Sequence, residues 1–196
     1  MGMFCFQCEQ TAKGTGCNSF GVCGKDPDTA ALQDLLVHAA KGISQYAHRA
    51  RQLGVKNHDA DTFILEALFT TVTNVNFDPK RLEIILRRGA QIRDTVRREY
   101  ETACAKAGRT AETPAGPAAW IPAADLDGLI RQGEAAGIET LLARRGPDIT
   151  GLMELLTYGL KGTAAYADHA YVLGREDDGV YAFFHEALDF LAGDNL

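Results

Sequence analysis

The sequence contains an internal repeat at a constant offset of 120 residues, and the two copies align without a gap. The identical positions include charged, aromatic and small residues as well as leucines: Lys41-Gly42 with Lys161-Gly162, Tyr46-Ala47 with Tyr166-Ala167, and Glu66-Ala67-Leu68 with Glu186-Ala187-Leu188. Any two amphipathic helices share leucines, but matches of this kind at one offset indicate duplication. We therefore expect two related helical units.

The first copy has the pattern of three helices. Asp26-Pro27 supplies an N-cap and a proline at the first helical position, and apolar residues then recur at helical spacing as far as Gly54. Asp61-Thr62 is expected to open a second helix. Asp78-Pro79 is expected to open a third, which runs to about Cys104. Three helices with short joins predict a three-helix bundle.

The second copy follows a proline-rich segment. Residues 109–122 contain three prolines and cannot continue a helix. A short helix is expected from Asp125 to Ala136, then a polar join at residues 144–147, then a long helix from Thr150. We therefore predict an all-α chain with these parts: a cysteine-rich loop (1–26), a first helical bundle (27–108), a linker (109–123) and a second, related bundle (124–196).

The second bundle is expected to be incomplete. Its third helix should begin near position 199, since the first unit's third helix begins at Pro79, and the sequence ends at Leu196. Two helices of a bundle leave uncovered the apolar stripe on which the third would pack. We therefore expect a longer parent protein, and a tendency of this chain to dimerise through the uncovered face.

Composition excludes several classes of function. The chain is 46% hydrophobic and 23% charged, which is typical of a globular protein. A net charge of −6 without a basic block disfavours nucleic-acid binding, which needs clustered cations. No apolar run approaches the roughly 20 residues that cross a bilayer, and no secretory signal is present. We expect a cytoplasmic location and soluble partners.

Four of the five cysteines lie in a short glycine-rich segment that has no amphipathic period. Their spacing is Cys5-x2-Cys8-x8-Cys17-x5-Cys23. Four thiolates on one loop can converge on a metal centre, and the glycines let backbone N–H groups approach the sulfur atoms. Nearby apolar and basic side chains could shield the centre and offset its charge: Phe4, Phe6 and Phe20, and Lys13 and Lys25.

Three kinds of site compete for these cysteines. A disulfide framework requires an oxidising compartment, for which the sequence has no signal. Structural zinc usually takes two close cysteine pairs, and only Cys5-Cys8 is such a pair, although zinc stays open as the alternative. The spacing favours an iron–sulfur cluster, and [4Fe–4S] moderately over [2Fe–2S]. Cys104 lies on a predicted helix far from the loop and is expected to be a buried, inert thiol.

Other titratable residues give weaker signals. His38, His48 and His169 are expected to be surface or core histidines, because none has ligands at a suitable spacing. Glu66, Glu186 and His185 do not match a di-iron site, which needs Glu-x-x-His on facing helices. The arginines of the third helix are expected to form a solvated face: Arg87, Arg88, Arg93, Arg97 and Arg98.

Three motifs resemble the N-terminus of the hybrid cluster proteins, also called prismane proteins or hydroxylamine reductases. They are the opening residues 3–12 (MFCFQCEQTA), the pair Gly16-Cys17 with Gly21-Val22-Cys23-Gly24-Lys25, and residues 32–36 (LQDLL). The resemblance implies a [4Fe–4S] cluster on Cys5, Cys8, Cys17 and Cys23. It also implies an all-helical domain of two three-helix bundles, followed by two α/β domains that carry a hybrid iron–sulfur–oxygen cluster. That second cluster reduces hydroxylamine to ammonia, and nitric oxide has also been implicated as a substrate.

This chain has no counterpart of the motifs that ligate the hybrid cluster. Four cysteines saturate a cubane and leave no open iron, so such a centre transfers single electrons. Hydroxylamine reduction needs two electrons and protons at an open metal. The chain alone is therefore expected not to be catalytic, but to pass electrons from a soluble donor to the rest of a parent enzyme. The alternative is a zinc-stabilised helical interaction module without redox activity.

Overall fold

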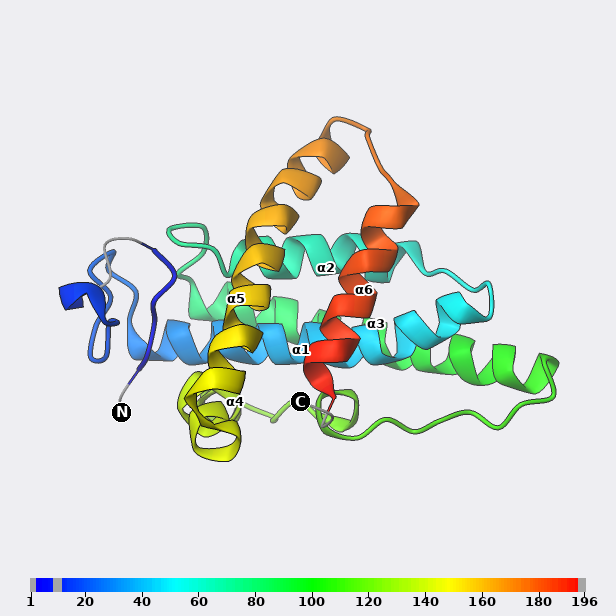
Figure 1. Cartoon of the computed structure of the whole chain (residues 1–196), viewed down its shortest axis with the longest axis horizontal. Coiled ribbons are helices and arrows are strands. Elements are labelled where there is room, and N and C mark those ends of the chain that lie inside the picture. Colours follow the sequence, from blue (N-terminus) through cyan, green and yellow to red (C-terminus); the bar gives the residue numbers. More distant parts are fainter. Residues whose placement is uncertain (1–2, 9–11, 194–196) are drawn as a thin grey trace.

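The computed structural model describes residues 3–8 and 12–193, which are all-α, as predicted. Helices α1, α2 and α3 lie side by side, and α5 and α6 cross them steeply (Figure 1). The cysteine-rich loop lies at the N-terminal end of α1. The elements are η1 (Ala12–Gly14), α1 (Pro27–Gln52), α2 (His58–Thr70), α3 (Pro79–Lys106), η2 (Gly116–Ala119), α4 (Leu126–Ala136), α5 (Ile138–Val172) and α6 (Asp178–Ala192).

Side-chain caps set most helix starts, because the first N–H groups of a helix have no partner within it. Asp26 and Asp78 cap α1 and α3 as predicted. The predicted start of the second helix was wrong. Asn57 is its cap and accepts a hydrogen bond from the N–H of Ala60 at 2.8 Å. Asp61 lies inside α2 and is buried, where it pairs with other side chains instead.

The duplication is visible in the helix bounds. Adding 120 to the bounds of α1 gives residues 147–172, and adding 120 to those of α2 gives residues 178–190. Helix α5 is broken at Gly146, whose φ of 76° is a backbone conformation that glycine adopts without strain. The long part of α5 therefore begins at Pro147, as α1 begins at Pro27. The predicted polar join is therefore a kink, and the helical turns before it, from Ile138, were not predicted.

Helix α1 is the centre of the packing. Helices α2, α3, α4 and α6 and the turn η2 all pack on it, while α5 packs on α2. Leu32, Leu36 and Ile43 are fully buried, and each such side chain contributes about 1.5–3 kcal/mol. One hydrophobic cluster includes residues of all six helices. The division into two bundles, residues 27–108 and 124–196, stays a prediction.

The segment predicted as a linker, residues 109–123, packs closely on α1 and α3, and we call it the strap. Ala118 and Trp120 are buried, and the N–H of Ala118 donates to Oε1 of Gln45 at 2.8 Å. Arg93 is also buried and donates to the carbonyl of Trp120. The expected solvated face was therefore wrong for Arg93, because the strap covers it.

A buried polar network joins the two copies of the repeat. Arg51 pairs with Asp61 at 2.7 Å, and Asp61 accepts a hydrogen bond at 2.9 Å from Nε2 of His185 on α6. Nδ1 of that imidazole lies 3.0 Å from Oγ of Ser44. Ser44 and His185 are both fully buried, so these groups fasten α6 to α1 and α2 and do not meet a substrate.

One face of α5 and α6 is apolar and exposed. Tyr166 is 81% exposed, whereas its counterpart Tyr46 is 3% exposed and packs beside Tyr100 of α3. Other residues on the face have the same relation to buried counterparts in the first copy: Leu152, Leu155 and Phe183. In the first copy α3 covers this face. No described helix is long and apolar enough to cross a membrane.

Two equivalent glycines should respond oppositely to the same substitution. A Cβ at Gly42 would meet the carbonyl of Pro117 in the strap, whereas a Cβ at Gly162 has nothing within 4 Å. Gly42→Ala should destabilise the chain by about 1–3 kcal/mol through this clash. Gly162→Ala should stabilise it by roughly 0.5–1 kcal/mol through helix propensity. Urea unfolding followed by helix circular dichroism measures both, and equal effects would contradict the close contact of strap and α1.

Candidate metal centre

The cysteine-rich loop is folded back on itself. The backbones of Cys5 and Cys17 are joined by two hydrogen bonds, one in each direction, with N···O distances of 2.9 and 2.8 Å. The N–H of Met3 donates to the carbonyl of Asn18 at 3.3 Å, which extends the pairing by one step. The first and third cysteines of the motif, twelve positions apart in the chain, are therefore adjacent in space.

Small apolar contacts fasten this loop to α1. Met3, Cys17 and Ala30 form a buried cluster separate from the main core. Gly16, at φ 150°, has no room for a side chain, because a Cβ there would lie 2.6 Å from the ring of Phe4. The rings of Phe4 and Phe6 lie 5.6 Å apart. Phe20 is exposed, and its shielding of the centre stays a prediction.

A buried lysine lies against the cysteines. Lys25 is only 3% exposed, and its Nζ lies 3.9 Å from Sγ of Cys5 and 5.8 Å from the ring centre of Phe77. Among the described residues no carboxylate pairs with it. An ammonium in such a place needs a nearby negative charge, which a thiolate or an anionic cluster supplies. Lys13, the other predicted cation, is exposed.

The cysteines of the motif are accessible to different degrees. Cys17 is buried, whereas Cys5, Cys8 and Cys23 are half-buried. Within residues 3–8 and 12–193, no three His, Cys, Asp or Glu side chains come close enough together to hold a single metal ion. A cubane carries one iron for each thiolate and so holds its ligands further apart than one ion does. The all-cysteine donor set and the buried cation fit a cluster, and its assignment stays a prediction.

The other candidate residues lie apart from the cysteines. His169 stacks edge-on against Phe69, and Glu66 pairs with Arg88. His185 belongs to the buried network with Asp61, and Cys104 is buried in the core as expected. These residues give no second metal site among the described parts of the chain.

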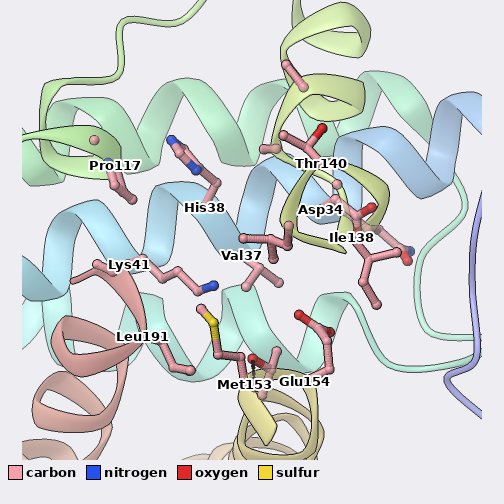
Figure 2. A pocket seen from close by; sticks show the side chains of 18 of the residues that line it. Asp34, Val37, His38, Lys41, Pro117, Ile138, Thr140, Met153, Glu154 and Leu191 are labelled. Atoms are coloured by element: carbon pink, nitrogen blue, oxygen red, sulfur yellow. Dashed lines mark hydrogen bonds between the residues drawn. The ribbon is translucent and has the colours of Figure 1, made fainter. Parts of the chain in front are cut away.

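A cavity of about 390 Å³ is lined by α1, the N-terminal two thirds of α5 and the cysteine-rich loop, with the strap and the C-terminal ends of α4 and α6 at its edges. Asp34 and Lys41 of α1 and Glu154 of α5 point into the same space (Figure 2). Lys161 also lines the cavity, which reaches Cys5 at its loop side.

The burial of these groups changes their titration. Burial raises the pKa of Asp34 to about 7, although Lys161 opposes the change. Burial also lowers the pKa of Lys41 and of Lys161, which are 8% and 5% exposed. His38, at the same cavity, has its pKa lowered to about 4 by burial and then by the charge of Lys41. His38 is thus held neutral, and no described cysteine contacts it.

Residues 3–196 match the Prismane/CO dehydrogenase family. The chain belongs to this family. It is 56% identical to a hydroxylamine reductase of Rhodospirillum rubrum over 190 residues, which are 97% of this chain and 35% of that protein. A hydroxylamine reductase of Geobacter metallireducens is 54% identical over 190 residues, 96% of this chain and 34% of that protein. The predicted resemblance is confirmed.

The chain spans about a third of the length of these curated relatives. The same holds for a hydroxylamine reductase of Methanocella arvoryzae, which is 45% identical over 194 residues, 99% of this chain and 35% of that protein. Family membership is therefore shown for residues 3–196 of this chain.

Sequence reasoning missed the cavity and its charges. The signal was present in the repeat, because Asp34 and Glu154, like Lys41 and Lys161, are 120 positions apart. When both copies of a repeat carry a charged residue at the same position among leucines, that residue is expected to face the interior. Lys41 and Lys161 were recognised only as matching positions of the duplication, and the acidic pair was not predicted.

The histidine and the carboxyl at this cavity should affect acid stability in opposite directions. Below pH 6.5 the unfolded chain takes up a proton at His38 that the folded chain refuses until about pH 4, so stability falls. Asp34 has the opposite effect on stability. Between about pH 7 and 3.8 its carboxyl is protonated in the folded chain and ionised in the unfolded chain, so acidification stabilises the fold at this residue. His38→Gln should therefore reduce the loss of stability on acidification, and Asp34→Asn should increase it.

Denaturant unfolding at several pH values between about 7 and 5, at equal metal content, measures the two slopes. If both variants changed the slope in the same direction, the assigned protonation states would be wrong.

Proposed function

We propose that Cys5, Cys8, Cys17 and Cys23 hold one [4Fe–4S] cluster, and that this chain is the electron-transfer part of a hydroxylamine reductase of the hybrid cluster type. The observation that carries the proposal is the buried ammonium of Lys25 beside Cys5. A cation at this depth is costly unless a negative charge lies near it, and four thiolates with a cluster provide such a charge.

The position of the loop suits the entry of electrons. It lies at one end of the molecule, beyond the N-terminus of α1 (Figure 1). Phe20 and Val22, between the last two cysteines, are exposed, and Cys23 is half-buried. A soluble donor can therefore approach the cluster closely. A reducing compartment such as the cytoplasm would keep the thiols available for iron.

This chain alone is not expected to reduce hydroxylamine. Four cysteines occupy every iron of a cubane, so no site remains for a substrate. Reduction of hydroxylamine, the activity named for the relatives, would take place at a hybrid iron–sulfur–oxygen cluster whose ligands lie outside this sequence. Nitric oxide reduction would require the same centre. Here the cluster relays single electrons.

The exposed face of α5 and α6 is where the rest of such an enzyme is expected to pack. In the first copy of the repeat α3 covers the equivalent residues. When this chain stands alone, a second copy is the predicted occupant of the same face.

The second candidate is a zinc-stabilised interaction module. The same four cysteines would then staple the loop to α1 without redox chemistry. The observation that favours this candidate is the firm attachment of the loop through Met3, Cys17 and Ala30, which serves a structural metal equally well.

Metal analysis of the anaerobically prepared chain separates the two candidates. We expect about four irons and four sulfides per chain, with a visible absorption band that bleaches on reduction by dithionite. Replacing Cys17 by Ser should remove most of the iron, whereas Cys104→Ser should keep it. One zinc without sulfide, even after reconstitution with iron and sulfide, would disprove the cluster.

Lys25 should raise the reduction potential of the cluster. Removing its charge in Lys25→Met leaves the added electron without a nearby cation. A unit charge about 6 Å away at an effective dielectric constant of about 20 is worth a few kcal/mol, so the potential should fall on the order of 100 mV. Lys13→Met removes an exposed charge from the same loop and should change the potential far less. Equal shifts in a redox titration would show that Lys25 does not face the cluster.

A further inference from the structure

We propose that Asp34, Glu154, Lys41 and Lys161 form a proton-binding site whose occupancy follows the redox state of the cluster. The inference rests on the proposed electron-transfer function and adds a proton to it. The site consists of two acids and two lysines in one cavity, and each pair is related by the internal duplication.

The four groups are open to protonation changes. In the part of the chain that the structure describes, no hydrogen bond or ion pair within 4 Å is formed by any of their side chains. The buried network of Arg51, Asp61 and His185 differs sharply, because there each charge is held at 2.7–2.9 Å by a partner. A proton can therefore enter or leave the cavity groups without breaking a protein contact.

The cavity is suited to hold water. Its volume of about 390 Å³ far exceeds the roughly 30 Å³ that one water molecule occupies. Lys41 and Lys161 are more than nine-tenths buried and line this space, and Lys41 extends into it (Figure 2). Water in the cavity would solvate the four side chains and connect them to one another.

Charges on the cysteine-rich loop can act on the side chains in the cavity, because the cavity reaches that loop. Cys5 and Lys25 line the loop side of the same space. The charge of Cys5 acts on Lys161, and that of Lys25 acts on Asp34. The other charges that act on Asp34 are those of Lys41 on α1 and of Glu154 and Lys161 on α5. Further titratable or charged groups line the same cavity: His38 on α1, and Arg144 and Arg145 on α5.

In the proposed step one electron and one proton enter the chain together. The soluble donor gives one electron to the oxidised cluster, and solvent gives one proton to the carboxylate of Asp34, whose O–H bond forms. Burial holds the pKa of this carboxyl near 7, so the added negative charge of the reduced cluster can raise its proton occupancy at neutral pH. Glu154 lines the same cavity, and its charge acts on Asp34. The electron and the proton would then leave together toward a reaction that consumes both.

The test is a redox titration of the cluster in the full chain at several pH values around 7. The midpoint potential of the unmodified chain should fall with rising pH, by up to about 59 mV per pH unit for one proton per electron. Asp34→Asn should flatten this dependence. Asp28→Asn removes an exposed acid from the same helix and should retain the full dependence.

A second measurement does not depend on a variant that folds. The infrared difference spectrum between the reduced and the oxidised chain should contain the band of a protonated carboxyl group, which shifts in D2O. A cluster whose potential is independent of pH, without that band, would overturn this inference and leave the proposed function intact. Failure of the chain to assemble any cluster would overturn both.

Discussion

The enclosure of α1 is the constraint on which the rest of the structure depends. Helices on several sides bury this helix along most of its length, and Gly42 and Gly133 allow the strap and α4 to approach α1 at backbone distance. The cap at its first turn fixes where the cysteine-rich loop ends. A charge on an enclosed helix must face either a partner or a cavity, and Asp34 and Lys41 face a cavity.

Local chemistry made the helices predictable. Aspartate followed by proline marks the starts of α1 and α3, and the duplication predicted the long part of α5. The errors arose where tertiary contacts decide. Aspartate is a common residue at helix starts, but Asp61 lies inside α2, where it pairs with Arg51 and His185. Arg93 was expected in solvent, and a strap from a distant part of the chain buries it.

The candidate site was predictable only as far as it is local. The cysteines and Lys25 belong to one short segment, so their spacing carried the information. The cavity depends on the angle at which α5 crosses the first three helices, and no local pattern encodes that angle. Only the repetition of Asp34 as Glu154 and of Lys41 as Lys161 pointed to it. The two features share the space beside Cys5, where we propose that proton uptake accompanies electron transfer.

We propose that the four cysteines hold a cubane cluster. A Mössbauer spectrum of the chain, prepared anaerobically with 57Fe, tests it most directly, because it reports the valence and environment of every iron. We predict the signature of delocalised mixed-valence iron pairs with sulfur coordination, diamagnetic when oxidised and paramagnetic after the addition of one electron. Two localised ferric ions would indicate a [2Fe–2S] centre, and the absence of specifically bound iron would contradict the account altogether.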